Sequence, residues 1–195
     1  MPAMSAIEGA LCRSAPWNSF ARRVILPWVL NGQALAGDVL EVGAGSGAMA
    51  EGIVHRFPDV HLTVTDVDDR MVAAARRRLA GHANVKVTQA SITALPFPDA
   101  NFDAVASYLM LHHVGSYRQA LAEAARALRP GGLFIGYDLA DSPLARVTHR
   151  LTSSPHLLVS SDGLRGGLAD AGFRTSTVRE SKVGHLMRFR AQTPR

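Results

Sequence analysis

The sequence predicts a single α/β domain with a parallel sheet covered by helices on both faces. From residue 38 onward, short apolar runs alternate with stretches of helical periodicity, as is typical of such a sheet. The first apolar run leads into a turn with glycine at every second position. The length of 195 residues suits one domain with a substantial core.

The glycine turn lies between a strand predicted at residues 39–42 and a helix predicted at 48–57. Its glycines are Gly43, Gly45 and Gly47. A strand-to-helix turn needs glycine where φ is positive or where a ligand approaches the bare backbone. The free amides at the start of the helix face whatever lies above the strand. The turn therefore predicts a site for a nucleotide-like ligand; the plainer alternative is a glycine turn without a ligand.

The later elements continue this alternation to the end of the chain. Ser116 and Gln119 have the spacing of a capping box, and Pro130 is expected to end the helix that they open. Gly172 is expected to close another helix, and Asp68 to cap the helix after the second strand. The predicted elements are strands at 61–65, 85–88 and 104–108, a helix at 117–128, a turn at 129–132, a strand at 133–138, a helix at 161–172, and strands at 173–178 and 185–191.

Two segments lie outside this alternation. Residues 5–35 predict one or two helices, with Pro16 and Pro27 at first-turn positions. Residues 139–160 form a connection punctuated by serine and proline. The single domain then consists of an N-terminal helical segment (1–36), a core (37–138) and a C-terminal part (139–195).

Composition excludes several classes of protein. Apolar residues make up 47% of the chain and charged residues 19%, which indicates a soluble globular protein. The single Cys12 excludes an internal disulfide framework and offers no metal cluster. The first 20 residues lack the apolar core of a secretory leader, and the apolar run at 24–30 is too short to cross a bilayer. A cytoplasmic location is therefore the default expectation.

The net charge of +5 comes mostly from arginine. A basic protein suits nucleic acid, anionic lipid or an acidic substrate. The run at 76–78 falls late in a helix, where cations complement the helix dipole, and is expected to form a solvated face. Residues 20–30 place arginines beside an apolar stretch with a tryptophan, as in a segment that contacts a membrane surface. A cover over a lipophilic acceptor would have the same pattern, so both interpretations stay open.

The glycine turn by itself fits two chemistries. Gly43, Gly45 and Ala48 satisfy the dinucleotide fingerprint, and Asp66 follows about twenty residues later, as that fingerprint requires. A short-chain reductase would also carry a Tyr-x-x-x-Lys pair, but neither lysine of the chain follows a tyrosine in that way. An NAD(P)-binding oxidoreductase is thus an alternative that the rest of the chain does not favour.

Six motifs decide between the two chemistries, namely 41–47, Asp66, 95–98, 102–105, 111–113 and 128–132. Their order resembles the class I S-adenosylmethionine-dependent methyltransferases, most closely the small-molecule branch that includes the quinone methyltransferases. The resemblance covers roughly residues 38–138. It implies that the N-terminal segment is a helical lid and that the connection at 139–160 also covers the substrate; the alternative for the N-terminal segment is that it only packs on the sheet. It implies a Rossmann-like sandwich with a seven-stranded, mostly parallel sheet of order 3-2-1-4-5-7-6. It also implies S-adenosylmethionine as the cofactor and S-adenosylhomocysteine as the product.

The resemblance places the cofactor across the carboxyl ends of the central strands. Gly43, Ala44, Gly45 and Gly47 would lie beneath its methionine-to-ribose stretch, where the backbone comes close. Asp66, at the end of the second strand, would accept hydrogen bonds from both ribose hydroxyls.

Five further residues complete the implied cofactor site. Val67 and Ile92 are expected to pack on opposite faces of the adenine. Ser91 stands where many relatives carry an aspartate that accepts from the adenine amino group, and its neutral hydroxyl accepts a weaker bond. Glu41 is expected to hold water or the amino group of the methionine moiety. The backbone carbonyl near Ser107 is the other candidate for that amino group.

The catalytic residues are harder to identify, because methyl transfer from a sulfonium depends mainly on positioning. A base is needed only where the acceptor must lose a proton. The candidate bases Tyr108, His112 and His113 lie where the chain leaves the fourth strand. Paired histidines are widespread at this place in the resembled family, so a structural role stays open. Our hypothesis is that His112 assists an oxygen acceptor.

The sequence thus predicts an enzyme that methylates a small molecule, with the acceptor atom open between oxygen, nitrogen and carbon. A lipophilic aromatic or quinone-like compound, a sugar and a secondary metabolite all fit. A nucleic-acid methyltransferase suits the charge, but residues 107–110 read Ser-Tyr-Leu-Met where exocyclic-amine enzymes carry Asp/Asn-Pro-Pro-aromatic. A cofactor-binding sensor without catalysis is a further alternative. Both a monomer and a homodimer fit the sequence.

Overall fold

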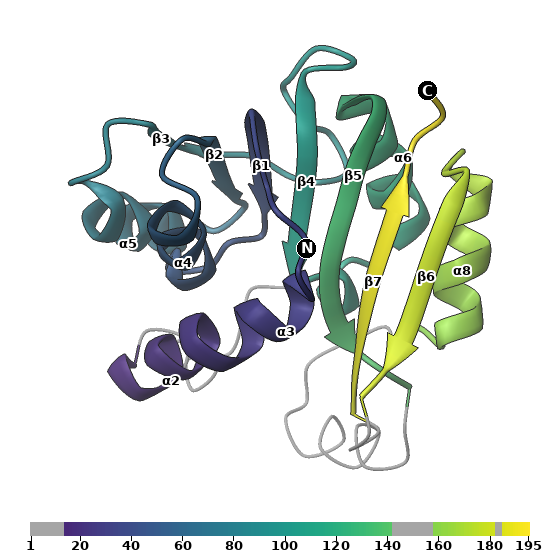
Figure 1. Ribbon diagram of the computed structural model, residues 1–195, viewed down its shortest axis with the longest axis horizontal. Coiled ribbons are helices and arrows are strands. Elements are labelled where there is room, and N and C mark those ends of the chain that lie inside the picture. Colours follow the sequence, from purple (N-terminus) through teal and green to yellow (C-terminus); the bar gives the residue numbers. More distant parts are fainter. Residues whose placement is uncertain (1–13, 142–157, 182–184) are drawn as a thin grey trace.

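The structure, a computed structural model, describes residues 14–141, 158–181 and 185–195. A seven-stranded sheet lies between two layers of helices (Figure 1), and its order β3-β2-β1-β4-β5-β7-β6 confirms the predicted one. The strands are β1 (Asp38–Val42), β2 (His61–Asp66), β3 (Val85–Gln89), β4 (Phe102–Tyr108), β5 (Leu128–Leu139), β6 (Thr175–Glu180) and β7 (Leu186–Gln192). The helical elements are α2 (Ala15–Phe20), the π-helical η1 (Ala21–Ile25), α3 (Leu26–Leu30), α4 (Ala48–Arg56), α5 (Asp69–Leu79), the 3-10 turn η2 (Leu111–His113), α6 (Tyr117–Ala127) and α8 (Ser161–Asp170).

The first five strands run parallel, and β7 is antiparallel to both of its neighbours. The central strands β1 and β4 are almost wholly buried, whereas the edge strand β6 buries only Val178. A parallel sheet is covered on both faces, which explains the continuous apolar runs at its centre. The carboxyl ends of β4 and β5 point to the lower edge of the sheet in Figure 1, and a sheet of this kind binds its ligand at that edge.

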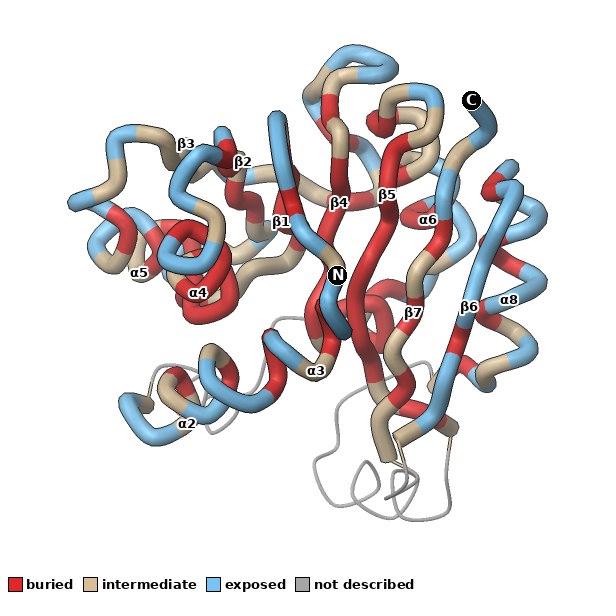
Figure 2. Tube along the Cα trace, viewed as in Figure 1, coloured by how far each residue is buried: buried red, intermediate tan, exposed pale blue. Residues whose placement is uncertain are grey.

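Each face of the sheet has its own buried core, and the central strands β4 and β5 between them are largely buried (Figure 2). Leu40 and Val42 belong to the core under α6 and α8. Val39 belongs to the other core, together with η1, α3, α4 and α5. Because side chains alternate along a strand, Glu41 points to the same face as Val39, beneath the N-terminal helices.

The N-terminal helices α2, η1 and α3 follow one another without a break. Pro16 and Pro27 occupy first-turn positions of α2 and α3, as predicted. The π-helical segment precedes Pro27, and its i to i+5 pattern ends with the Leu26 amide donating to the Ala21 carbonyl. Proline has no amide hydrogen, so an interruption of the α pattern falls naturally at this point. Within the described ranges, no helix is long and apolar enough to span a bilayer.

Two predictions around α6 are wrong. Ser116 makes no side-chain cap, and Gln119 Nε2 donates to the Thr93 carbonyl at 2.9 Å and not back to the start of the helix. The predicted turn at 129–132 lies within β5, as a bulge across which the register with β4 shifts. Gly131 has a φ of 75° there, so the glycine serves the bulge and does not end the helix.

The expected solvated arginine run at 76–78 is also only partly correct. Arg78 Nε donates to the Ser46 carbonyl at 2.8 Å, and its Nη1 lies 3.2 Å from Glu51 Oε2. Arg76 reaches the Val87 carbonyl of the edge strand β3 at 3.4 Å. These arginines tie α5 to its neighbours, a long-range role that a charge run does not reveal. The predicted strands at 173–178 and 185–191 begin two residues and one residue later in the structure.

Candidate active site

The glycine turn connects β1 to α4 at the carboxyl edge of the sheet. Gly43, Gly45 and Gly47 have positive φ angles of 63°, 55° and 80°, which explains glycine at each position. Their surroundings differ. A Cβ on Gly43 would lie 2.1 Å from Met110 Cγ, and one on Gly47 would lie 3.3 Å from side chains of α5. A Cβ on Gly45 would meet no atom within 4 Å, so of the three only Gly45 offers bare backbone to a ligand.

Asp66 ends β2 and holds the glycine turn. Its Oδ2 accepts a hydrogen bond from the Gly45 amide at 2.8 Å, and its Oδ1 accepts one from the Asp68 amide at 2.9 Å. Burial raises the pKa of Asp66, and these two amide hydrogen bonds counteract part of the rise. Asp68 caps α5 by accepting from the Arg70 amide at 2.8 Å, as predicted. The carboxylate of Asp66 is therefore fixed directly beside the open backbone of Gly45.

Glu41 and Tyr108 are two buried polar side chains on neighbouring strands at the same edge. Among the described residues, both carboxylate oxygens of Glu41 and the hydroxyl of Tyr108 lack a hydrogen-bond partner. Burial, and then the charge of Asp66, raise the pKa of Glu41 well above 4.5. Burial, and then Glu41 and Tyr137, raise the pKa of Tyr108 well above 10.0. Because an unpartnered buried polar group is unfavourable, these two side chains mark a place where a ligand would gain interactions.

His112 lies in η2, directly after β4, and it pairs with an aspartate. Its Nδ1 lies 2.5 Å from Oδ1 of Asp138, near the end of β5, and both residues are buried. The Asp138 carboxylate also accepts hydrogen bonds from the amides of Met110 at 3.1 Å, Leu111 at 2.6 Å and Leu139 at 2.7 Å. One buried carboxylate thus fixes both the backbone of η2 and the imidazole ring of His112.

The backbone between β4 and η2 is strained. Leu109 has a φ of 53°, a left-handed conformation that is rare for a branched residue. Its amide donates to the Tyr137 carbonyl at 2.8 Å, which holds it in this conformation. Met110 follows and packs against Gly43 of the glycine turn. The strained turn therefore places His112 on a segment that touches the glycine turn directly.

The family is decided by similarity to known proteins, taken together with this geometry. Residues 39–132 match the protein-family profile described as "Methyltransferase domain". The chain is 31% identical over 132 residues to a demethylmenaquinone methyltransferase of Clavibacter sepedonicus, across 67% of this chain and 50% of that protein. The chain belongs to the class I S-adenosylmethionine-dependent methyltransferase family.

A second curated relative and a solved structure show how much of each protein the similarity covers. The methyltransferase chain is 35% identical over 125 residues to a fatty-acid O-methyltransferase of Mycolicibacterium smegmatis, across 57% of this chain and 45% of that protein. A solved S-adenosylmethionine-dependent methyltransferase of Aquifex aeolicus shares the fold with a TM-score of 0.76 at 20% identity, across 97% of this chain and 99% of that chain. The chain spans half the length, or less, of these curated relatives, so they contain segments beyond the shared part.

The residues expected around adenine also lie at the carboxyl edge of the methyltransferase sheet. Val67 follows β2 and is 40% exposed, whereas Ile92 belongs to the buried core and is 3% exposed. The Ser91 hydroxyl lies 2.8 Å from Thr93 Oγ1 and accepts from the Thr93 amide at 3.3 Å. The Ser107 hydroxyl is buried, and among the described residues it has no hydrogen-bond partner. Their contacts with the cofactor stay a prediction.

Sequence reasoning missed Asp138, which holds His112. A signal was available, because Asp138 closes an apolar strand in the same way as Asp66 does. Carboxylates at the carboxyl ends of parallel strands lie at the ligand-binding edge. His113, the other histidine of the pair, lies against His112 with ring centroids 4.0 Å apart and the ring planes tilted by 41°. The role of His112 towards a substrate stays a prediction.

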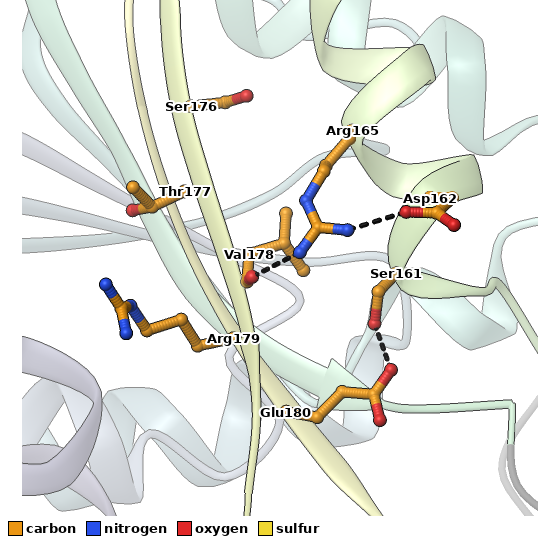
Figure 3. A pocket seen from close by; sticks show the side chains of 8 residues that line it. All are labelled: Ser161, Asp162, Arg165, Ser176, Thr177, Val178, Arg179 and Glu180. Carbon is orange, nitrogen blue, oxygen red and sulfur yellow. Dashed lines mark hydrogen bonds and ion pairs between the residues drawn. The ribbon is translucent and has the colours of Figure 1, made fainter.

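A cavity of about 750 Å³ lies elsewhere, between α8 and the edge strand β6 (Figure 3). Its walls are polar, and Arg165 crosses it to bond Asp162 at 2.6 Å and the Val178 carbonyl at 2.7 Å. Ser161 and Glu180 are hydrogen-bonded to each other. In the sheet, β6 is separated from β1 by three strands, so this cavity is distinct from the glycine-turn site of the methyltransferase.

Proposed function

We propose that this chain transfers the methyl group of S-adenosylmethionine to a small molecule by in-line displacement. The observation that carries the proposal is the open backbone of Gly45 beside the fixed carboxylate of Asp66. A nucleotide-like ligand needs both features, because its sugar approaches the chain closely and offers hydroxyl donors to a charged acceptor. When bound, the cofactor supplies an activated methyl group on its sulfonium.

Each predicted cofactor residue has a role in this proposal. Asp66 accepts from the ribose hydroxyls, while Val67 and Ile92 border the adenine. Ser91 contributes a hydroxyl at the adenine edge, in competition with its bond to Thr93. The turn residues Gly43, Ala44, Gly45 and Gly47 form the floor of the site.

Glu41 fits the cationic end of the cofactor. Its buried carboxyl has no partner among the described residues, and its pKa is raised by burial and by Asp66. A positively charged amino group would provide the missing hydrogen bond and restore the charged carboxylate. Ser107, whose hydroxyl is also buried and unpartnered in the described chain, is the second polar group at this end.

His112 is the base that we propose for an acceptor that must lose a proton. With the Nδ1 hydrogen donated to Asp138, the neutral ring carries its lone pair on Nε2, which can take the proton of a hydroxyl. The acceptor oxygen then bonds to the methyl carbon as the carbon–sulfur bond breaks. Tyr108 suits this role less well, because its raised pKa keeps the phenol protonated near neutral pH. Tyr108 is better suited to donate a hydrogen bond.

The acceptor is proposed to be lipophilic. The relatives named above act on a demethylmenaquinone and on a fatty acid. In this chain three aromatic rings lie next to one another towards the carboxyl edge of the sheet. Trp28 packs edge-on to Tyr137 with ring centroids 6.1 Å apart, and the ring centroids of Tyr137 and Tyr108 are 6.0 Å apart. Trp28 belongs to the N-terminal segment 1–36, which we propose as a cover over the acceptor. The connection at 139–160 is the second proposed cover, and most of it lies outside the described residues.

A transfer assay with methyl-labelled S-adenosylmethionine tests this function. The purified protein is incubated with lipophilic phenols, reduced quinones, fatty acids and a DNA oligonucleotide. We expect label in a small-molecule acceptor, and its loss in Asp66→Asn. Label in the oligonucleotide alone would support a nucleic-acid methyltransferase instead. Binding of the cofactor without transfer to any acceptor would support the sensor alternative.

A further inference from the structure

The outer face of the N-terminal helix and the adjoining surface of α4 share a basic and apolar character. We propose that this surface docks on an anionic phospholipid membrane. The proposal rests on the proposed function in one respect: docking would serve to deliver a lipophilic acceptor to the enzyme. The docking surface itself is argued from exposure and charge.

The outward side of the continuous helix α2-η1-α3 is apolar. Its exposed stripe contains Pro16, Phe20, Val24 and Pro27, at helical spacing, with Arg23 among them. Phe20 is 46% exposed and Val24 is 50% exposed. A surface helix of a globular protein normally presents a polar outer stripe. This helix is instead apolar on both sides, because its inner stripe is buried in the core beneath it.

Exposure of this kind is concentrated in the N-terminal helix. In the described part of the chain, the large apolar side chains that are exposed are Phe20, Val24 and Val67. Val67 lies in the cofactor site, where a ligand would cover it. Phe20 and Val24 lie one helical turn apart, and Figure 2 shows the outer side of α2 as exposed. They form a small apolar patch that no described segment covers.

A basic cavity of about 380 Å³ adjoins this apolar patch. It lies where η1 and α3 meet α4, and its basic residues are Arg22, Arg23, His55 and Arg56. Gly52 brings the two helices together, since a Cβ there would lie 2.7 Å from a methyl carbon of Leu26. None of the described residues that line this cavity is acidic.

The charges of this cavity are only partly compensated. Arg22 is paired with Glu51 at 2.6 Å, and the same carboxylate oxygen lies 3.2 Å from Arg78. Glu51 is thus shared by two arginines. Arg23 and Arg56 are exposed and make no ion pair with any acidic residue of the described chain. The surface therefore carries at least two uncompensated positive charges next to exposed apolar side chains.

This combination matches an anionic lipid surface better than other anions. Apolar side chains enter the boundary between headgroups and acyl chains, while neighbouring arginines remain with the anionic headgroups. A free phosphate would use the arginines but not Phe20 and Val24. The helix also carries Trp28, which packs against Tyr137 near the carboxyl end of β5. A membrane on its outer side would therefore lie close to the proposed acceptor site.

Vesicle co-sedimentation tests the proposal. The full chain is mixed with vesicles of phosphatidylcholine alone or of phosphatidylcholine with phosphatidylglycerol, at low and at moderate salt. We expect binding to the anionic vesicles only, weakened by salt. Reversing the charge of Arg23 and Arg56 together (R23E, R56E) should lower partitioning by at least about fivefold per arginine, from about 1 kcal/mol for each basic residue near an anionic surface.

Matched variants separate docking from other effects. Arg174→Glu with Arg179→Glu makes the same change in net charge on the edge strand side of the sheet, and should bind like the wild type. Phe20→Ser with Val24→Ser should also lose binding. Calorimetric binding of S-adenosylhomocysteine should be unchanged in every variant, which shows intact folding and keeps this test separate from that of the proposed function.

Three results would overturn the proposal. The first is no binding of the wild type to anionic vesicles. The second is equal binding of the wild type and the R23E, R56E variant. The third is a concentration-dependent dimer of the wild type that Phe20→Ser with Val24→Ser dissociates, because the apolar patch would then belong to a second copy of the chain.

Discussion

The polar side chains at the two ends of strands β1 and β4 differ in whether they have hydrogen-bond partners. At the amino end, Arg129 bonds Asp38 at 2.8 Å and Asp103 at 2.6 Å, and Asp103 also accepts from the Asp38 amide. At the carboxyl end, Glu41 and Tyr108 are buried without a partner in the described chain. On the same two strands, the polar side chains named at the amino end are paired with each other, whereas burial of those at the carboxyl end is unfavourable without a ligand. The difference indicates that the amino end serves stability and the carboxyl end serves binding.

The pKa values show the same contrast. At the amino end, burial alone would raise the pKa of Asp103, but hydrogen bonds from the Asp38 amide and Arg129 outweigh it and hold the pKa below 3.8. At the carboxyl end, burial and the charge of Asp66 raise the pKa of Glu41 above 4.5. The two carboxylates should therefore respond to pH with opposite signs.

The largest expected effect is on activity, at the carboxyl end. His112→Gln should lower kcat roughly 10²- to 10⁴-fold with an oxygen acceptor, because the proton then lacks its base. Affinity for S-adenosylhomocysteine should stay the same. Asp138→Asn should also lower kcat with this acceptor, since Asp138 sets which nitrogen of His112 accepts the proton. An unchanged kcat in His112→Gln would leave the histidine a structural role only.

The next effect should combine a loss of binding with a gain in stability. Glu41→Gln replaces a buried carboxyl, whose charged form is unfavourable there, by an amide that stays neutral, so the unliganded protein should gain about 1–3 kcal/mol in its free energy of unfolding at neutral pH. Binding of S-adenosylhomocysteine should weaken roughly tenfold or more, because a charge-assisted hydrogen bond is lost. Thermal unfolding with and without the ligand measures both changes. A destabilised Glu41→Gln protein would mean that Glu41 has a structural partner.

The pH dependence of unfolding sharpens the comparison. The folded pKa of Glu41 lies above 4.5, so its favourable contribution is present below pH 4.5 and is lost as pH rises towards the folded pKa. The folded pKa of Asp103 lies below 3.8, so its contribution is present above pH 3.8 and is lost as pH falls further. The stability gained by Glu41→Gln should therefore grow as pH rises from about 4.5. Denaturant unfolding across this range, with Asp103→Asn as the opposite case, measures both trends.

The smallest effect is expected at the amino end. Arg129→Ala should lower the free energy of unfolding only slightly, since its ion pairs are partly exposed. Arg174→Ala, an exposed arginine at the sheet edge, is the control and should change stability less. Neither change should alter S-adenosylhomocysteine affinity. A loss of affinity in Arg129→Ala would show that the two ends of the strands are coupled.

Features encoded by neighbouring residues could be predicted from the sequence. The apolar runs, the glycine turn and Asp66 after β2 are local patterns, and they were enough to predict that the turn and Asp66 meet at the carboxyl edge of the sheet. The strand order came from the resemblance, since the antiparallel insertion of β7 between β5 and β6 has no local signal.

Long-range contacts could not be predicted. Gln119 bonds the Thr93 carbonyl and not the start of its own helix, and Arg78 reaches Ser46 across 32 positions. The pairing of His112 with Asp138 joins the ends of two adjacent strands. In each case the side chain could satisfy more than one partner, and the tertiary fold selects one of them.

Calorimetric titration of the wild-type chain with S-adenosylhomocysteine, with NADH as the control, tests the central claim most directly. We expect saturable binding of S-adenosylhomocysteine, no binding of NADH, and a loss of about 1.5–3 kcal/mol in Asp66→Asn, which is roughly 10- to 150-fold in Kd. Binding of NADH in place of S-adenosylhomocysteine, or equal affinity in Asp66→Asn, would contradict the assignment of the carboxyl edge as the cofactor site.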